Sequence, residues 1–193
     1  MLSEPPGAKE DPRVVRTRNL ILNAFMELLP TKGFKSLTVR GITEVARVNR
    51  ATFYAHFPDK YALLDYAIRE AFRQELERRA LDAYHHSQDS LRALTVTVCE
   101  FVEQSTKHCG TAEHQFESLV ERQVKKQIQE LMELWLEQVG SENDPKTAAT
   151  AASWAIYGLA VQWSQDKNRP SAQAYAERVL PLVSGCITYR GEL

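Results

Sequence analysis

The chain has 193 residues, a formal net charge of −1 and 44% hydrophobic residues, which is enough apolar content for one large domain or two small ones. No run of about 18 apolar residues occurs, and the first residues lack the basic and apolar regions of a signal peptide, so we expect a cytoplasmic protein. Three cysteines without CxxC spacing indicate reduced thiols rather than a disulfide framework.

The charge is divided unevenly along the chain. Residues 1–60 carry ten Lys and Arg against six Asp and Glu, whereas residues 61–193 carry fourteen against nineteen. Because a positive surplus attracts phosphate, the first sixty residues are the better candidate for contact with nucleic acid. The surplus is modest, and solvated helical surfaces often reach it, so charge alone shifts the interpretation only slightly.

The first sixty residues predict a tail and three helices. Residues 1–12 are rich in proline, glycine and charge and predict a disordered tail. The first helix is expected over about 13–29, ending just before Pro30. Thr38 can cap the second helix and Asn49 the third, with a short turn between them. This pattern is typical of a helix-turn-helix, whose second helix enters the DNA major groove.

The remainder of the chain also has helical periodicity, with no strand pattern and no repeat, so we expect an all-α fold. Asp144 followed by Pro145 is a strong helix start, an N-cap and a proline at the first helical position. Further helices are expected over about 59–84, 88–108, 113–139, 145–166 and 171–189, the last one kinked at Pro181.

The third helix has two different faces. Phe53 and Phe57 lie four residues apart and predict a buried face, and Arg50 and Tyr54 form the matching pair on the opposite side. Arg50 can donate two hydrogen bonds to guanine, and the small Ala51 can meet a thymine methyl group.

Several nearby polar residues suit the DNA backbone. Thr52, Tyr54 and Lys60 can donate to phosphate oxygens, and Asn49 caps a helix N-terminus that favours phosphate. Such contacts position the helix without specifying a base sequence. An isolated helix-turn-helix pattern is only moderately specific, because many helical hairpins share its spacing.

The stretch from about Arg16 to Leu64 resembles the N-terminal domain of the TetR/AcrR transcriptional regulators. The resemblance is carried by four motifs in this order: IL-AF--LL over residues 21–29, GF at 33–34, LTV--IT over 37–43 and VNRATFYAHFPDKYALL over 48–64. The TFYAHFPDK segment is the most specific of them.

The resemblance implies a homodimeric repressor with a three-helix DNA-binding domain, residues 13–60, and a helical ligand-binding and dimerisation domain, residues 61–193. Its implied partners are a palindromic double-stranded DNA operator, a small-molecule effector and a second copy of the chain. The residues expected to contact DNA are Thr38, Arg40, Arg47, Asn49, Arg50, Ala51, Thr52, Tyr54, His56 and Lys60. For His56, a structural role at the start of the fourth helix is an alternative.

Two positions depart from the family pattern. Relatives usually have glycine in the turn where this chain has Arg47, so either a non-glycine residue accepts left-handed backbone or the turn differs. Arg47 could also add a phosphate contact. Gly41 lies inside the second helix, at a cost of up to about 1 kcal/mol relative to alanine.

The C-terminal region contains a stripe of small residues and a set of aromatic ones. The small residues, Ala148, Ala151, Ala152, Ala155 and Gly158, allow close helix packing, either across a dimer with the last helix or within one chain. The aromatic residues Phe101, Phe116, Trp135, Trp154 and Tyr157 could line an effector cavity, although aromatic side chains at helical spacing are more often ordinary core. We expect an apolar or aromatic effector, since a strongly anionic one would need a basic lining.

Nothing in the sequence favours an enzyme or a metal site. His108, Cys109 and His114 lie close together without a recognised ligand spacing, and we expect no metal and no cofactor. No phosphate-binding loop, nucleophile elbow or carboxylate pair stands out. The leading interpretation is a ligand-responsive DNA-binding repressor, and the alternative is a helical ligand-binding or interaction protein without operator binding.

Overall fold

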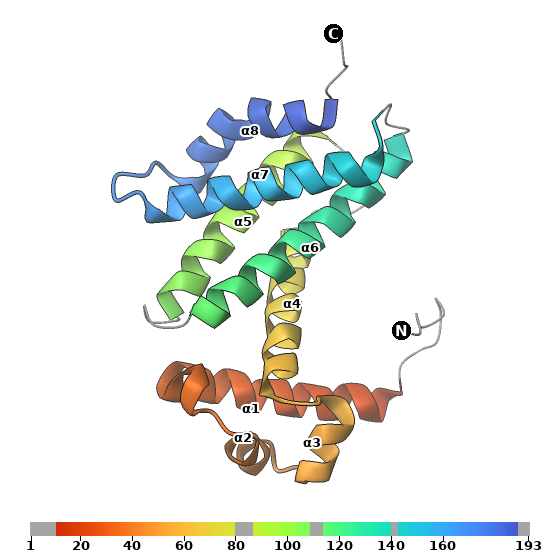
Figure 1. Ribbon diagram of the computed structural model, residues 1–193, viewed down its shortest axis with the longest axis vertical. Helices are drawn as coiled ribbons and strands as arrows, with labels where there is room; N and C mark the ends of the chain where they lie inside the picture. Colours follow the sequence, from red (N-terminus) through yellow and green to blue (C-terminus); the bar gives the residue numbers. More distant parts are fainter. Residues whose placement is uncertain (1–10, 80–86, 109–113, 140–142, 189–193) are drawn as a thin grey trace. The chain divides into compact units, whose positions relative to one another are not determined.

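The computed structural model describes residues 11–79, 87–108, 114–139 and 143–188. Within these ranges the chain forms α-helices and no strand, which confirms the all-α expectation (Figure 1). The helices are α1 (Pro12–Ser36), α2 (Val39–Ala46), α3 (Arg50–His56), α4 (Lys60–Arg78), α5 (Gln88–His108), α6 (His114–Val139), α7 (Pro145–Gln165) and α8 (Ala172–Thr188).

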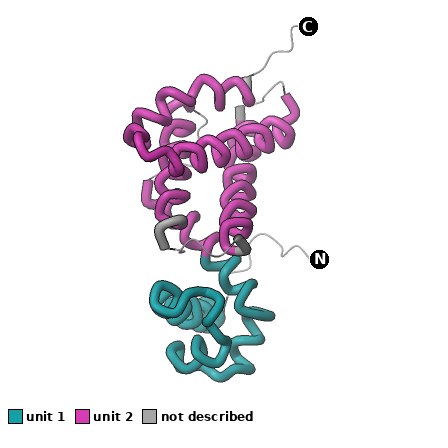
Figure 2. Tube along the Cα trace, turned by 60° about the vertical axis from the view of Figure 1, so that its left-hand side comes forward, with its two compact units in different colours: residues 1–67 teal, residues 68–193 magenta. Residues whose placement is uncertain are grey.

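The chain divides into two compact units, residues 1–67 and 68–193, shown in different colours in Figure 2. The division falls inside helix α4, seven residues beyond the end of the DNA-binding motif at residue 60. Helix α4 therefore begins in the first unit and ends in the second. Its expected continuation to residue 84 lies outside the described residues.

Helix α1 is longer than its sequence predicts. The Asp11 carboxylate accepts a hydrogen bond from the Arg13 amide at 2.8 Å and caps the helix, so the start of α1 includes the last two residues of the expected tail. Residues 1–10 of that tail lie outside the described residues. The helix does not end before Pro30 but continues to residue 36, with a break at Gly33.

Two local features occur along this continuation. Pro30 lacks the amide that would donate to the carbonyl of Met26, and one residue later the Thr31 hydroxyl donates to the Leu28 carbonyl at 3.0 Å. The change of direction is taken instead by Gly33, whose φ of 67° is in the region that favours glycine. Phe34 is thereby buried and packs edge-on against Phe25 with ring centroids 6.3 Å apart.

The core of the first unit joins its four helical segments. Phe53 and Phe57 are buried, as their spacing predicted, and Phe57 packs against Tyr66 of α4 with ring centroids 5.4 Å apart. Apolar residues with essentially no exposed surface come from every segment: Ile21 and Phe25 from α1, Ile42 from α2, Phe53 from α3 and Leu63 from α4. Burial of these side chains fixes the relative positions of the helices within this unit.

The second unit is a bundle in which α7 packs against α5, α6 and α8 (Figure 1). Helix α7 begins as expected, with Pro145 at its first position and the Asp144 carboxylate accepting from the Thr147 amide at 2.9 Å. Helix α8 passes through Pro181. The alanines of α7 that face the bundle let the helices approach closely, and Ala149, Ala152 and Ala160 are fully buried.

Helix α4 is held in the second unit by its C-terminal half. The Phe72 ring is fully buried and meets the Phe101 ring of α5 edge-on, with centroids 5.0 Å apart. Just beyond the helix, Arg79 forms an ion pair with Glu100 of α5. Within the described residues, no helix is both long enough and apolar enough to cross a membrane.

Candidate DNA-binding surface and ligand cavity

The turn between α2 and α3 is built on left-handed backbone at Arg47. Its φ and ψ are 53° and 41°, so of the two alternatives the first holds: a non-glycine residue accepts left-handed backbone here. Left-handed backbone costs a residue with a Cβ about 1–2 kcal/mol. The turn is closed by the Val48 amide, which donates to the Thr43 carbonyl at 3.1 Å. The Arg47 side chain is exposed.

Both helices that flank this turn are capped as the sequence predicted. The Thr38 hydroxyl accepts from the Gly41 amide at 3.1 Å at the start of α2. The Asn49 side chain accepts from the Ala51 amide at 2.9 Å at the start of α3. These caps satisfy amides that the first helical turn leaves without partners and fix where each helix begins.

The candidate DNA contacts share the solvent-facing side of α2 and α3. Tyr54 is 49% exposed, while its neighbour Phe53 on the opposite side is completely buried. Arg40 is also exposed and pairs with Glu44 at 2.8 Å. The exposed candidates are Thr38, Arg40, Arg47, Asn49, Arg50, Ala51 and Tyr54, whereas Thr52 and His56 are half-buried. The arrangement leaves a largely polar face that carries three arginines exposed to solvent.

Lys60 has a role that differs from the expected phosphate contact. Its ammonium donates to the carbonyl oxygens of Phe34, Lys35 and Leu37 at 3.0, 3.1 and 2.9 Å. An ammonium has three hydrogens, so these bonds use its full donor capacity. The same Nζ lies 4.7 Å from the centre of the Phe34 ring. Lys60 therefore joins the end of α1 to the start of α4 and has no donor left for phosphate in this conformation.

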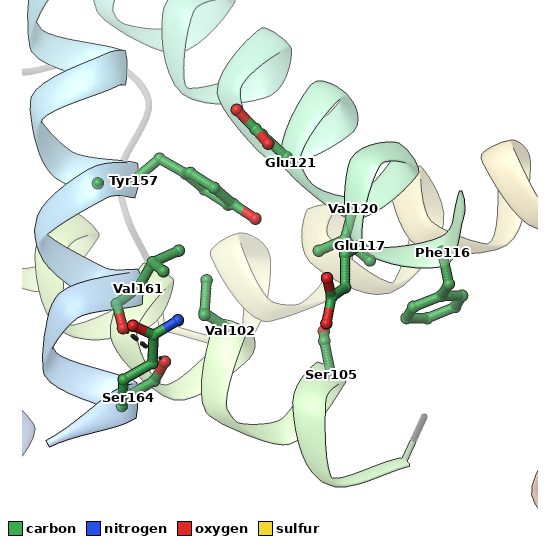
Figure 3. Close-up of a pocket in the computed structure, with 11 residues that line it drawn as sticks. Val102, Ser105, Phe116, Glu117, Val120, Glu121, Tyr157, Val161 and Ser164 are labelled. Carbon is green, nitrogen blue, oxygen red and sulfur yellow. Dashed lines mark hydrogen bonds between the residues drawn. The ribbon is translucent and has the colours of Figure 1, made fainter. Parts of the chain in front are cut away.

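A cavity of about 510 Å³ lies among α5, α6 and α7 in the second unit (Figure 3). Helix α5 contributes Val102 and Ser105, α6 contributes Phe116, Glu117, Val120 and Glu121, and α7 contributes Tyr157, Gly158, Val161, Ser164 and Gln165. Valine and phenylalanine side chains provide apolar surface, and hydroxyl, amide and carboxylate groups provide polar contacts. A site of this volume and mixed lining suits a small organic molecule.

Of the five aromatic residues expected to line a cavity, Phe116 and Tyr157 do so. The other three are not among the lining residues. Trp135 is completely buried in the bundle, and Phe101 packs against Phe72. Trp154 is 62% exposed, with the Lys125 ammonium 3.5 Å from its ring centre. The large side chains of Trp135 and Phe101 are buried by ordinary core packing. Helical spacing alone does not distinguish an aromatic residue in the core from one that contacts a ligand.

Apart from Tyr157, the polar residues of this lining carry no distinguishing signal in the sequence. Glu117, Glu121 and Ser105 lie on helices whose polar residues alternate with apolar ones in the usual amphipathic way. A carboxylate that faces a cavity has the same sequence signal as one that faces solvent. The packing of three helices was needed to distinguish them.

The carboxylates influence the phenol of Tyr157. Burial is the main cause that raises the pKa of Tyr157 above its usual range, and the negative charges of Glu121 and Glu117 raise it further. The hydroxyl therefore stays protonated at neutral pH and remains a hydrogen-bond donor. In Figure 3 this hydroxyl points into the space between α6 and α7.

No cluster of three potential metal ligands occurs among the residues that the structure describes. The expected weak candidate, His108, Cys109 and His114, has side chains outside that set. Cys99 is fully buried, and burial together with the nearby Glu100 charge raises its pKa to about 12, so its thiol remains protonated.

The capped helices α2 and α3, the turn between them and the exposed face of α3 have the form of a helix-turn-helix. Residues 21–67 match the sequence model of the family described as bacterial regulatory proteins, tetR family. The N-terminal segment of the chain is therefore similar to the DNA-binding segment of tetR-family regulators, as the motifs of the first unit indicated.

Two curated relatives match a segment of this chain. An uncharacterised HTH-type transcriptional regulator, YxbF of Bacillus subtilis strain 168, is 38% identical over 72 residues, which cover 34% of this chain and 19% of the relative. The class G tetracycline repressor protein of Vibrio anguillarum is 39% identical over 64 residues, covering 33% of this chain and 30% of the repressor. The similarity thus spans less than a third of either relative's length.

Solved structures resemble the whole fold. A TetR-family regulator from Streptomyces coelicolor has a TM-score of 0.58 at 16% identity, covering 92% of this chain and 99% of its own. RolR in complex with the ligand resorcinol has a TM-score of 0.55 at 18% identity, covering 93% of this chain and 96% of its own. At these identities the likeness establishes the fold.

The left-handed turn generates a prediction for Arg47. Replacing it with glycine should stabilise the protein by about 1 kcal/mol, because glycine adopts positive φ without a Cβ clash. Arg47→Ala provides the matched control, since it removes the same charge but keeps the Cβ. Urea denaturation measures both free energies of unfolding. An equal stability change in the two variants would contradict backbone strain as the cause.

The contacts of Lys60 generate a second prediction. Lys60→Met keeps much of the aliphatic stem but removes the ammonium that donates to three carbonyls, of which that of Phe34 also accepts from the Leu37 amide. We expect a loss of about 1–3 kcal/mol in stability. Because the ammonium is not available to phosphate, the salt dependence of DNA binding should not change. A decrease of about one in the slope of log K against log salt would instead indicate a phosphate contact. Lys32→Met, an exposed lysine on α1, is the control.

Proposed function

We propose that this protein is a dimeric transcriptional repressor whose first unit binds a palindromic operator and whose second unit binds a small-molecule effector that releases the DNA. The observation that carries the proposal is the structure of α3, which buries Phe53 and exposes Arg50, Ala51 and Tyr54 on its other side. A helix with this division fits the major groove while remaining anchored in its own core.

The proposed roles on DNA follow from chemistry and exposure. Arg50 reads a guanine edge and Ala51 contacts a thymine methyl group. Thr38, Arg47 and Tyr54 bind phosphate, and Thr52 and His56 contact the backbone at the margin of the surface. Arg40 binds a base or a phosphate once it leaves Glu44. Lys60 acts by holding the surface in place rather than by touching DNA.

A dimer is proposed through α7 and α8. Trp154 on α7 and Leu182 on α8 are 62% and 64% exposed, the highest values among the large apolar side chains that the structure describes. The expected stripe of small residues is split, because Ala148 and Ala152 are buried within the bundle while Ala151 is exposed beside Trp154. Two-fold symmetry would allow two copies of α3 to address half-sites about 34–36 Å apart.

Regulation is proposed to act through α4, which is continuous between the two units. Lys60 in its first turn donates to carbonyls at the end of α1, and Phe72 in its later turns packs on α5. Helix α5 also lines the cavity. An effector that binds one arrangement of the second unit more tightly would shift the population toward it. A displaced α4 would then change the spacing of the two DNA-reading helices. The ligand-bound RolR structure supports a small molecule as effector of this fold.

The proposal is tested by measuring the affinity of the purified protein for a palindrome from the promoter region of its own gene. Fluorescence anisotropy at about 150 mM salt should show binding at least a thousandfold tighter than to a shuffled duplex. Equal affinity for both duplexes would refute the repressor function and favour a ligand-binding protein without an operator. The relatives are transcriptional regulators, which are generally not enzymes, and the proposal includes no catalytic step.

Arg50 provides the sharpest test of base recognition. Arg50→Ala should weaken binding to the operator by about 1–3 kcal/mol and relax the preference at one base pair, because bidentate contacts to guanine are lost. Binding to shuffled DNA should weaken much less. Lys167→Ala, which removes one exposed positive charge from the second unit, controls for net charge. Equal losses on both duplexes for Arg50→Ala would exclude a base-reading role.

A further inference from the structure

We propose that the cavity among α5, α6 and α7 binds an organic cation, a molecule with an apolar or aromatic body and one positively charged nitrogen held near Glu117 and Glu121. The inference deepens the proposed function, since it assigns a chemical class to the effector of the same cavity. Its basis is the charge of the lining, the distribution of apolar surface and the geometry of Tyr157.

The charge of the lining is one-sided. Two of its eleven residues are carboxylates, and none is lysine, arginine or histidine among the described residues. Both carboxylates come from α6, one helical turn apart, so they lie on the same side of the cavity. A ligand in this space therefore meets a negative potential from one wall.

Lys125 is a cation adjacent to this wall. Lys125 donates to Oε1 of Glu121 at 2.7 Å, and its ammonium also lies over the Trp154 ring outside the lining. A carboxylate has about four acceptor positions, so one ammonium does not exhaust it. Glu117 likewise has a polar partner within the protein. The two carboxylates retain acceptor capacity for a ligand.

The rest of the lining suits the apolar part of such a ligand. Val102 on α5, Val120 on α6 and Val161 on α7 approach from three sides, and the Phe116 ring closes one end (Figure 3). Contact with these side chains removes apolar ligand surface from water, and aromatic rings also attract a nearby cation. The cavity thus offers apolar side chains to the apolar part of a ligand and two carboxylates to its charged nitrogen.

Tyr157 lines the cavity close enough to both carboxylates to be affected by their charge. Its side chain projects from α7 toward α6, with the hydroxyl directed at the region of Glu121 and Glu117 (Figure 3). The charges of both carboxylates help to raise the pKa of this phenol, which means that a negative charge at its oxygen is disfavoured. The same potential would disfavour a ligand carboxylate or phosphate and favour an ammonium.

Three probes with the same naphthalene body separate the ligand classes: 2-naphthylmethyl-trimethylammonium, 2-naphthylmethanol and 2-naphthylacetate. Isothermal titration calorimetry of the intact protein should show the ammonium binding about tenfold tighter than the alcohol, with the acetate weakest. The advantage of the ammonium should shrink as salt is raised, because the site is partly open to solvent. If the alcohol or the acetate binds as tightly as the ammonium, or if none of the three binds, the proposal is overturned.

Substitutions identify the groups responsible. The double variant Glu117→Gln with Glu121→Gln should abolish the preference for the ammonium while leaving affinity for the alcohol within about twofold, since the cavity keeps its shape. Glu130→Gln on the same helix, outside the lining, is the matched control and should keep the full preference. An equal loss for all three probes in the double variant would show that the carboxylates shape the site rather than select its charge.

A second variant tests whether the probes bind inside this cavity. A Cβ added at Gly158 would meet nothing within 4 Å, so Gly158→Leu can be introduced without backbone strain and should project into the space. Affinity for the ammonium should fall at least tenfold, with an unchanged circular dichroism spectrum. Unchanged affinity would place the bound cation elsewhere and overturn the assignment.

The failure of this inference can be distinguished from failure of the repressor function. The same ammonium is added to the complex of protein and operator, and release of DNA is followed by anisotropy. Carboxylate-dependent binding without release would support the cation site and refute effector control. Operator binding that responds to the neutral alcohol but not to the ammonium would support the repressor and refute the cation class.

Discussion

The first unit depends on the bonds that Lys60 makes to the end of α1. The last carbonyls of a helix have no donors within the helix, and here the break at Gly33 turns the chain before α2 begins. The Lys60 ammonium supplies donors to the carbonyls of Phe34, Lys35 and Leu37, so the exit from α1, the entry to α2 and the start of α4 meet at one group. That junction ties the entry to α2 to the start of α4, in addition to the apolar core that the four helices share.

The surface proposed to bind DNA contains two capped helix starts and one residue with strained backbone. Thr38 and Asn49 set the first turns of α2 and α3 by capping them, and these bonds involve residues two or three positions apart. Arg47 takes left-handed backbone despite its Cβ. Buried Phe53 makes α3 part of the core, which keeps the exposed face in a fixed orientation without requiring contacts from the residues that would touch DNA.

The cavity depends on where α7 packs closely against its neighbours and where it does not. Helix α7 approaches its neighbours closely where alanine replaces larger side chains, as at Ala149 and Ala152, and leaves space where Gly158 and Val161 face α6. The space is lined by two carboxylates of α6 and, on α5 and α7, by apolar, hydroxyl and amide groups. Such a site differs from a core defect, because a dry cavity in a core is normally lined by apolar groups alone.

Sequence alone determined the features that arise from neighbouring residues. Helix α5 was predicted at its observed bounds, both caps around the turn were identified, and Phe53 was correctly assigned to the core, because periodicity and capping act within one or two turns. The tertiary structure decided what depends on residues far apart. Tertiary packing continued α1 past Pro30 and placed the Lys60 ammonium against carbonyls at the end of α1. It also buried Trp135 away from the cavity and placed Glu117 and Glu121 in the lining. A helical pattern tells which side of a helix is polar, but only the packing of other helices against that side determines whether it faces solvent, a carbonyl or a ligand.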